Sequence, residues 1–271
     1  MSSVSDERPP DDLAAVFDAP LSHAPRTLHL RYAASVTSTM DVAAAAVRAD
    51  APEGLTVVAN AQTAGRGRRG RTWQSPPGAG LYFSIVFRPP LDGTSVRVLS
   101  LITLAAGLGV RGGIAEVTGL VTDLKWPNDV LIGRRKVAGI LAEGHGLGGG
   151  MQAVVIGVGV NVRQSALDGN AADRATSLEA ELGRPVMRGP LLAALLVAVP
   201  AAYRRLIRGE ADAILREWRA GAPSALGSRV EWDTSHGVER GTTAGVDEHG
   251  ALLIQTPTAV ERFVGGELRW I

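Results

Sequence analysis

The 271-residue chain contains no cysteine, which excludes disulfide bonds, thiolate catalysis and cysteine-ligated metals. Acidic and basic residues almost cancel at a formal net charge of +1, so no overall basic field favours nucleic acid as a partner. The longest uncharged apolar run, Pro190–Tyr203, is too short to cross a membrane, and the N-terminus lacks the apolar core of a signal peptide. These absences predict a cytoplasmic protein whose electrostatic function is local.

Lysine is nearly absent as well. Of the 28 basic residues only Lys125 and Lys136 are lysines, and the other 26 are arginines. Codon bias explains an excess of arginine wherever a positive charge alone is needed. The alternative is that these two positions require a compact ammonium group, which a planar guanidinium cannot replace. We favour the second interpretation because each lysine lies beside another motif.

The order of apolar and turn-forming segments predicts an α/β domain over residues 26–222 and a small β-barrel over residues 223–271. The acidic, proline-rich residues 1–25 are expected to form a mobile tail. Helical spacing occurs in Met40–Ala49, Val96–Val117 and Gly189–Arg219. Strand-like runs are Arg26–Ala34, Leu55–Ala59, Leu81–Phe87, Val130–Ile132, Lys136–Glu143 and Ala153–Val160, with four more after Pro223 and a hairpin at Asp247–Gly250.

A glycine–arginine segment, Gln62–Trp73, follows one of these strands. Its glycines allow the backbone to approach a ligand closely, and its arginines can pair with phosphate or carboxylate oxygens. Two other interpretations compete: an RNA- or DNA-binding strip with Trp73 for base stacking, and a merely solvated loop. The segment matches neither the phosphate-binding loop that ends in Gly-Lys-Ser/Thr nor the dinucleotide fingerprint.

A second segment, Lys125-Trp126-Pro127-Asn128-Asp129, presents two short polar side chains from a turn that proline constrains. An ordinary turn that closes a hairpin explains it equally well. Lys136 opens the strand that follows and is well placed to reach an anion. Glycines inside strands, Gly139 here and Gly157 in the next strand, mark either the close approach of a ligand or room for a neighbouring helix.

Taken together and in order, five motifs resemble the biotin protein ligases of bacteria. They are Ser38-Thr39-Met40, the segment from Gln62 to Gly70, Lys125–Asp129, Lys136–Leu141 and Gly157–Asn161. The resemblance covers about residues 28–271 and implies a mixed-sheet α/β (α+β) catalytic domain of the biotin/lipoate protein ligase type, followed by a small SH3-like barrel. It also implies that ATP and Mg²⁺ convert biotin to biotinyl-AMP, from which biotin is transferred to a lysine of the biotin carboxyl carrier protein.

The resemblance also implies roles for individual residues. Ser38, Thr39 and Gln62 would bind the ureido end of biotin. Gly65, Arg66, Gly67 and Arg68 would belong to a loop that orders over biotin and the adenylate phosphate, and Trp73 would pack near the adenine. Lys136 would contact the biotin carboxylate and the phosphate. The remaining implied site residues are Asp129, with a metal-organising and proton-accepting role, and Lys125, Asn128, Gly139, Gly157 and Asn161 around the nucleotide and biotin.

Two features of the sequence qualify the resemblance. Met40 stands where many family members have asparagine, and its thioether cannot donate a hydrogen bond, so a backbone or packing role is expected there. Fewer than about 30 residues precede the first expected strand, too few for the DNA-binding domain of some members, so no DNA binding is expected. A monomer and a homodimer both fit the sequence. A lipoate ligase and a non-catalytic RNA-binding protein are the alternative functions.

Overall fold

The computed structural model describes residues 8–18, 28–90, 95–147, 150–167, 173–235 and 237–271. The helices are α1 Asp11–Asp18, α2 Thr39–Arg48, α3 Ser95–Thr118, α4 Leu178–Leu182, α5 Arg188–Ile207 and α6 Ala211–Ala220. The strands are β1 His29–Val36, β2 Leu55–Gln62, β3 Gly80–Phe87, β4 Asp123–Lys125, β5 Asp129–Ile132, β6 Arg135–Leu147, β7 Gly150–Asn161, β8 Leu226–Thr234, β9 Gly237–Val246, β10 Leu252–Gln255, β11 Val260–Phe263 and β12 Arg269–Trp270.

Seven strands form one mixed sheet in the order β1-β2-β3-β7-β6-β5-β4. Strands β1 and β2 run parallel, and every other neighbouring pair is antiparallel. The mixed α/β architecture expected from the sequence is therefore confirmed. The strand β4 and the short helix α4 were not expected, because three and five residues carry too little periodicity to predict an element.

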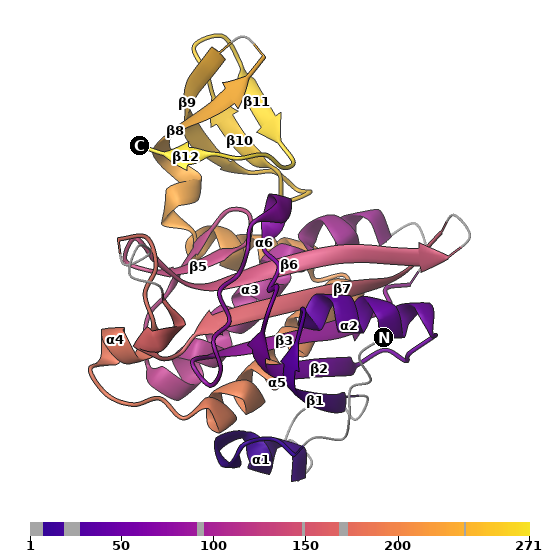
Figure 1. The fold of residues 1–271 in the computed structure, drawn as a ribbon. Helices are drawn as coiled ribbons and strands as arrows, with labels where there is room; N and C mark the ends of the chain where they lie inside the picture. Colours follow the sequence, from indigo (N-terminus) through magenta and orange to yellow (C-terminus); the bar gives the residue numbers. More distant parts are fainter. Residues whose placement is uncertain (1–7, 19–27, 91–94, 148–149, 168–172, 236) are drawn as a thin grey trace.

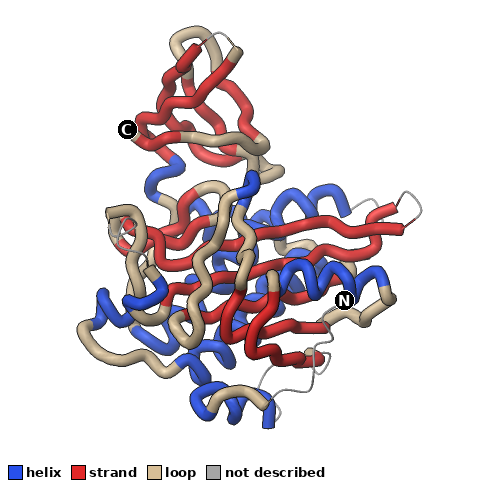
Figure 2. The backbone as a smooth tube through the Cα atoms, in the orientation of Figure 1, coloured by secondary structure: helices blue, strands red, loops and turns tan. Residues whose placement is uncertain are grey.

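Helices cover both faces of this sheet (Figures 1 and 2). Side chains alternate along each strand, so Val57 and Val155 belong to a cluster with α2, whereas Val58 and Ile156 belong to the larger core on the opposite face. That larger core includes α3 and α5, with α6 packed on α3. Burial on both faces explains why the central strand β3 is apolar nearly throughout.

Helices α3 and α5 pack closely because α3 carries glycines at the contact. A methyl group at Gly109 would lie 2.7 Å from the Val199 Cα, and one at Gly113 would lie 2.9 Å from the Leu195 Cδ2. By length and composition α3 and α5 could each cross a membrane, but 61% and 56% of their apolar windows are buried inside the fold. Their hydrophobicity is that of core helices.

The expected mobile tail needs a correction, because residues 11–18 of it form helix α1. Leu13 and Val16 are buried, since α1 packs on α5. Asp12 pairs with the buried Arg188 through two hydrogen bonds of 2.7 and 2.8 Å, and Arg188 also donates to Asn60 of β2. The sequence did not predict this helix, because Arg188, which holds Asp12 in place, is 176 residues away in the chain. Residues 1–7 and 19–25 of the expected tail lie outside the described residues.

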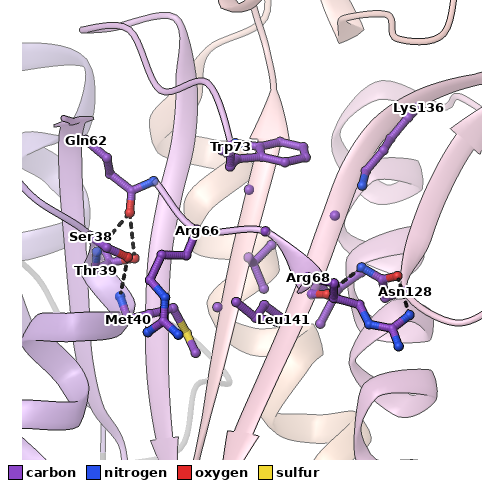
Figure 3. A pocket seen from close by; sticks show the side chains of 16 residues that line it. Ser38, Thr39, Met40, Gln62, Arg66, Arg68, Trp73, Asn128, Lys136 and Leu141 are labelled. Carbon is purple, nitrogen blue, oxygen red and sulfur yellow. Dashed lines mark hydrogen bonds between the residues drawn. The ribbon is translucent and has the colours of Figure 1, made fainter. Parts of the chain in front are cut away.

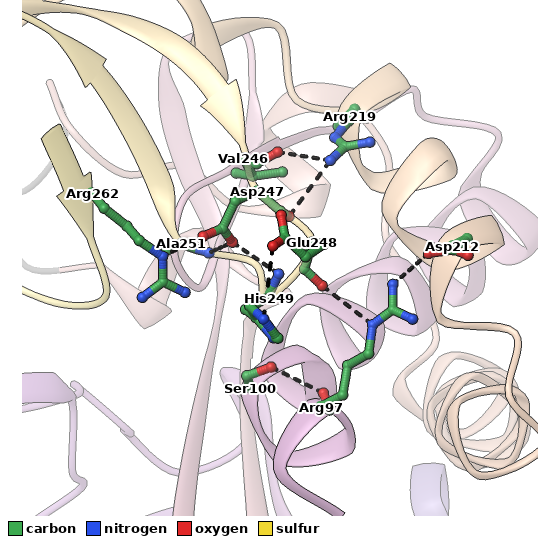
Figure 4. Close-up of polar contacts among 10 residues, drawn as sticks. All are labelled: Arg97, Ser100, Asp212, Arg219, Val246, Asp247, Glu248, His249, Ala251 and Arg262. Carbon is green, nitrogen blue, oxygen red and sulfur yellow. Dashed lines mark hydrogen bonds and ion pairs between the residues drawn. The ribbon is translucent and has the colours of Figure 1, made fainter. Parts of the chain in front are cut away.

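The C-terminal strands form a separate antiparallel sheet in the order β11-β10-β9-β8-β12, as expected for a small SH3-like barrel. Its hairpin at Asp247–Gly250 is confirmed, and the Asp247 carboxylate accepts hydrogen bonds from the His249 and Ala251 amides. Figure 4 shows this hairpin against the larger sheet domain, where Arg97 of α3 donates to the Glu248 carbonyl and Arg219 of α6 donates to the carbonyl of Val246, the last residue of β9. The hairpin therefore anchors the barrel.

We predict that Asp12→Ala lowers the free energy of unfolding at pH 7 by about 2–3 kcal/mol, because it leaves the buried Arg188 guanidinium without its carboxylate. The matched control is Asp11→Ala, an exposed residue of the same helix turn, with an expected effect within about 0.5 kcal/mol. Urea denaturation measures both. Equal effects of the two variants would contradict the role given to Asp12.

The same pair predicts a pH dependence. The Arg188 guanidinium lowers the pKa of the Asp12 carboxyl below its ordinary value. A lowered folded-state pKa contributes stability above the unfolded-state pKa of about 4, and that contribution is lost as the pH falls through the folded-state value. The stability difference between the wild type and Asp12→Ala should therefore shrink below about pH 4.

Candidate active site

A polar cluster at the start of α2 forms one end of the site. Ser38 caps the helix by accepting from the Met40 amide, which is why the chain turns into a helix here. Gln62, at the end of β2, accepts from the Thr39 amide at 2.8 Å and from its hydroxyl at 3.2 Å. The Gln62 amide nitrogen donates to the Ser75 hydroxyl at 2.7 Å. Each side chain is thus held in one orientation, with hydrogen-bonding capacity left for a ligand.

The floor of the site is a patch of sheet without side chains. Gly139 of β6 pairs with Gly159 of β7, and Gly157 lies two residues away on the same face. A methyl group at Gly159 would overlap the Trp73 indole, and one at Gly157 would overlap the Met40 thioether. The glycines therefore make room for these two apolar side chains, which wall the pocket. Met40 has the packing role that the sequence indicated, with 3% of its surface exposed.

The glycine–arginine loop crosses in front of this pocket. Its two arms pair at Arg66 and Thr72, and it turns at Arg69 and Gly70, whose φ angles are +57° and +73°. Arg66 at its base bridges two carboxylates, that of Asp41 in α2 at 2.8 Å and that of Glu143 in β6 at 2.5 Å. The loop is therefore tied to both sides of the pocket.

The opposite end of the site is charged. The Lys136 ammonium lies 2.6 Å from a carboxylate oxygen of Asp129 and 5.1 Å from the centre of the Trp73 ring. Arg68 donates to the Asn128 side chain at 3.4 Å, and Asn128 in turn donates to the Ile140 carbonyl at 2.9 Å. Figure 3 shows Thr39 and Gln62 at one end of the pocket, Lys136, Arg68 and Asn128 at the other, and Trp73 between them.

Burial lowers the pKa of two cations at this end of the site, Lys125 and Arg68. It lowers the pKa of Lys125, an effect that the attraction of Asp129 partly offsets and that the repulsion of Lys136 and Arg134 increases. Burial likewise lowers the pKa of Arg68. A cluster in which cations outnumber the nearby carboxylate Asp129 and lose hydration is stabilised by an anionic ligand. The site therefore suits a phosphate or a carboxylate.

The expected site residues divide between two adjoining pockets. Those lining the first pocket are Ser38, Thr39, Met40, Gln62, Arg66, Gly67, Arg68, Trp73, Asn128, Lys136, Gly139 and Gly157. The second pocket is lined by Lys125 and Asp129, and shares Gly67, Arg68, Trp73, Asn128 and Lys136 with the first. Because Lys136 lines both, it lies where ligands in the two pockets would meet. The Trp73 indole nitrogen has no hydrogen-bond partner among the described residues and can donate to a ligand.

Two expected residues line neither pocket. Gly65 lies at the base of the loop, where its carbonyl accepts from the Trp73 amide at 2.8 Å. Asn161 is buried and donates to the Thr176 carbonyl at 3.1 Å, while the Thr176 amide donates to the Lys136 carbonyl at 2.9 Å. Asn161 therefore supports the backbone beside Lys136.

Sequence reasoning missed several residues of the site. Asp41 and Glu143 hold Arg66, but they are 25 and 77 residues away from it in the chain. Ser75 fixes the orientation of Gln62. Trp270, one residue from the C-terminus, lines the second pocket. A carboxylate or tryptophan without a surrounding motif gives no sequence signal of such a contact.

Comparison with known proteins matches residues 32–161 to the model of the Biotin/lipoate A/B protein ligase family. The bifunctional ligase/repressor BirA of Bacillus subtilis is 34% identical over 242 residues, which cover 89% of this chain and 73% of that protein. The biotin–[acetyl-CoA-carboxylase] ligase of Mycobacterium tuberculosis is 32% identical over 265 residues, covering 91% of each chain. Among solved structures, the biotin protein ligase from Aquifex aeolicus in complex with biotin and ATP has a TM-score of 0.75 at 28% identity, covering 90% of this chain and 98% of that one.

The identity and coverage of these relatives extend over both the sheet domain and the barrel. The chain therefore belongs to the Biotin/lipoate A/B protein ligase family and, within it, to the biotin protein ligases. The resemblance stated from the five motifs is confirmed.

We predict that removing both carboxylates that hold Arg66, with Asp41→Asn and Glu143→Gln together, accelerates tryptic cleavage at Arg68–Arg71 about five-fold. Exposed ion pairs contribute up to about 1 kcal/mol, and losing that much raises the equilibrium constant for opening of the loop about five-fold. Asp50→Asn, which removes an exposed ion pair with Arg88 elsewhere on the surface, is the matched control. Cleavage at the control rate would show that the carboxylates do not restrain the loop.

Proposed function

We propose that this chain is an ATP-dependent biotin–[biotin carboxyl carrier protein] ligase. It joins biotin to ATP to form biotinyl-5′-AMP and transfers the biotin to a lysine of the carrier protein of acetyl-CoA carboxylase or a related biotin-dependent carboxylase. The observation that carries the proposal is Lys136 at the junction of two pockets, one with a polar end and apolar walls, the other cationic. The relatives with biotin ligase names support the choice of substrates.

The first pocket suits biotin along its length. Ser38, Thr39 and Gln62 would hydrogen-bond the ureido group, which needs both donors and acceptors. Met40 and Trp73 would pack against the apolar ring and chain of biotin above the glycine floor. The carboxylate would then reach Lys136, since this residue lines the opposite end of the pocket.

The first step joins the two substrates at that junction. A biotin carboxylate oxygen attacks the α-phosphorus of ATP, the bond from that phosphorus to the bridging oxygen breaks, and pyrophosphate leaves. Lys136 and Arg68 would neutralise the negative charge that the α-phosphate oxygens gain in the transition state. Their fixed positions, through Asp129 and Asn128 respectively, would avoid the cost of reorienting them during the reaction.

The second step requires a neutral acceptor amine. We propose that Asp129 accepts a proton from the acceptor lysine, whose nitrogen then attacks the acyl carbon of biotinyl-AMP and displaces AMP. Asp129 lies beside Lys136 and lines the second pocket, so its carboxylate is close to the bond that breaks. Arg66–Arg71 would cover the adenylate between the two steps and exclude water from it.

Magnesium is best treated as part of the ATP substrate. Among the described residues no group of three or more His, Asp or Glu side chains is arranged to hold a metal ion. Mg²⁺ commonly binds through substrate phosphates with one or two protein carboxylates. Asp129, with Asn128 beside it, fits the role of such a single carboxylate.

The domain boundaries and the partners follow from the same proposal. Residues 26–222 would bind biotin and ATP, and residues 223–271 would form the barrel domain. Because the substrates are ATP and a carboxylase subunit, we propose a cytoplasmic location. We also propose no DNA partner, because the net charge of +1 provides no overall basic field. The proposal holds for a monomer and for a homodimer alike.

The decisive experiment measures transfer of biotin to a purified carrier domain with ATP, alongside biotin-dependent and lipoate-dependent exchange of pyrophosphate into ATP. Biotin is expected to support both reactions. Exchange with lipoate alone would overturn the proposal in favour of a lipoate ligase. Tight, salt-sensitive RNA binding without adenylate formation would instead favour the RNA-binding alternative for Arg66–Arg71.

Lys136→Ala is expected to reduce biotin-dependent pyrophosphate exchange by about 10²–10³-fold, because it removes a charge that stabilises the transition state. Arg135→Ala is the matched control, since Arg135 precedes Lys136 but is exposed and pairs with Glu181. Circular dichroism verifies that both variants fold. A folded Lys136→Ala protein with unchanged exchange would refute the role of Lys136.

Arg68→Gly is expected to let biotinyl-AMP escape from the site, because the loop loses its contact with Asn128 and a cation over the phosphate. The escape is measured as biotin attached to serum albumin added as a bystander, and we expect about a ten-fold increase, the equivalent of 1.4 kcal/mol. Arg184→Gly, at an exposed loop arginine that lines neither pocket, serves as the control. Bystander labelling equal in both variants would mean that Arg68 does not retain the adenylate.

A further inference from the structure

The last residues of the chain form part of the second pocket. Strand β12 pairs with β8 of the barrel, and the segment from Gly266 to Trp270 lines the pocket opposite Lys125–Asp129. The second pocket is therefore built from two domains.

Trp270 gives this segment a ring contact with the cationic end. The Lys125 ammonium lies 4.1 Å from the centre of the Trp270 ring, well inside the range of a cation–π interaction. Lys125 is one of only two lysines in the chain, and it is half-buried. An aromatic partner suits such a position because it attracts the ammonium and leaves its charge uncompensated. A carboxylate would neutralise that charge. The nearby carboxylate, Asp129, is already paired with Lys136.

Trp270 is held in place from the barrel side. Its indole nitrogen donates to the Ser224 carbonyl at 3.4 Å, and the neighbouring Arg269 pairs with Glu231 and Asp233 at 3.0 and 2.6 Å. On the other side of the pocket, the Trp126 indole donates to the Gly250 carbonyl of the barrel hairpin at 3.0 Å. The turn that carries Lys125 and the strand that carries Trp270 are thus fixed to the same domain.

We propose that Trp270 is a positioning residue that aims the Lys125 ammonium at the phosphates that leave as pyrophosphate. The inference rests on the proposed function. Lys136 lines both pockets and therefore meets the α-phosphate, whereas Lys125 lines only the second pocket, beyond that junction. Its charge is placed to bind the β- and γ-phosphates, and the barrel thereby contributes to ATP binding.

The test compares Trp270→Leu with Trp270→Phe, which keeps an aromatic ring. Measured quantities are the KM for ATP, the inhibition constant of inorganic pyrophosphate, and the dissociation constant of biotin. Trp270→Leu should raise the first two about five-fold and leave the third unchanged, because biotin occupies the other pocket. Trp270→Phe should change both constants much less than Trp270→Leu does, because it keeps an aromatic ring. Ile271→Ala, which changes the exposed neighbouring residue, is the matched control and should behave as the wild type.

A double-variant cycle with Lys125→Met separates positioning from simple packing. If Trp270 acts through Lys125, Trp270→Leu should have no further effect on either constant in the Lys125→Met background. Equal losses in Trp270→Phe and Trp270→Leu, or effects that add in the double variant, would overturn the inference. So would an unchanged KM for ATP in Trp270→Leu. A wild-type protein that does not biotinylate the carrier would instead contradict the proposed function itself.

Discussion

The site depends on one feature of the sheet: its central strand β3 is buried on both faces, so helices pack on each side. Helices α3 and α5 pack on one face, and α2 packs on the other. At the N-terminal end of α2, the strands carry glycines at 139, 157 and 159, and the Trp73 indole and the Met40 thioether lie on them. The pocket is the space left between this glycine floor and the loop that crosses it. A side chain at any of the three glycines would displace a wall of the pocket.

The charges around the pocket are arranged asymmetrically. Cationic side chains from the loop and from two strands converge on a region in which Asp129 is the central carboxylate, and burial lowers the pKa of Lys125 and Arg68. Such a cluster opposes its own formation and is stabilised when an anion arrives. In contrast, Arg66 at the loop base is paired with two carboxylates, so its role is to hold the loop. The same short segment thus contains arginines that anchor it and one, Arg68, that lines both pockets.

The barrel is integrated with this site as well as attached to the domain. Its hairpin packs on α3, where a methyl group at Gly250 would lie 2.9 Å from side-chain carbons of Leu101 and Leu104. Arg71 in the loop pairs with Glu267 in the segment that leads to β12. The loop, the Lys125–Asp129 turn and the end of the chain therefore meet around one pocket. Their relative positions depend on the interface between the two domains.

From the sequence alone, the class of fold, the order of most elements and the motif residues that line the pockets could be predicted. This was possible because periodic apolar runs, the serine cap and clustered glycines and arginines are local signals. Helix α1, strand β12 and the partners of Arg66 and Lys125 could not be predicted. Arg188 that holds α1, Asp41 and Glu143 that hold Arg66, and Trp270 that faces Lys125 lie far from their partners in the chain and carry no motif of their own. Only the tertiary structure decided these contacts. An ion pair or a ring contact depends on the distance between two side chains in space, and that distance cannot be read from the separation of two residues in the sequence.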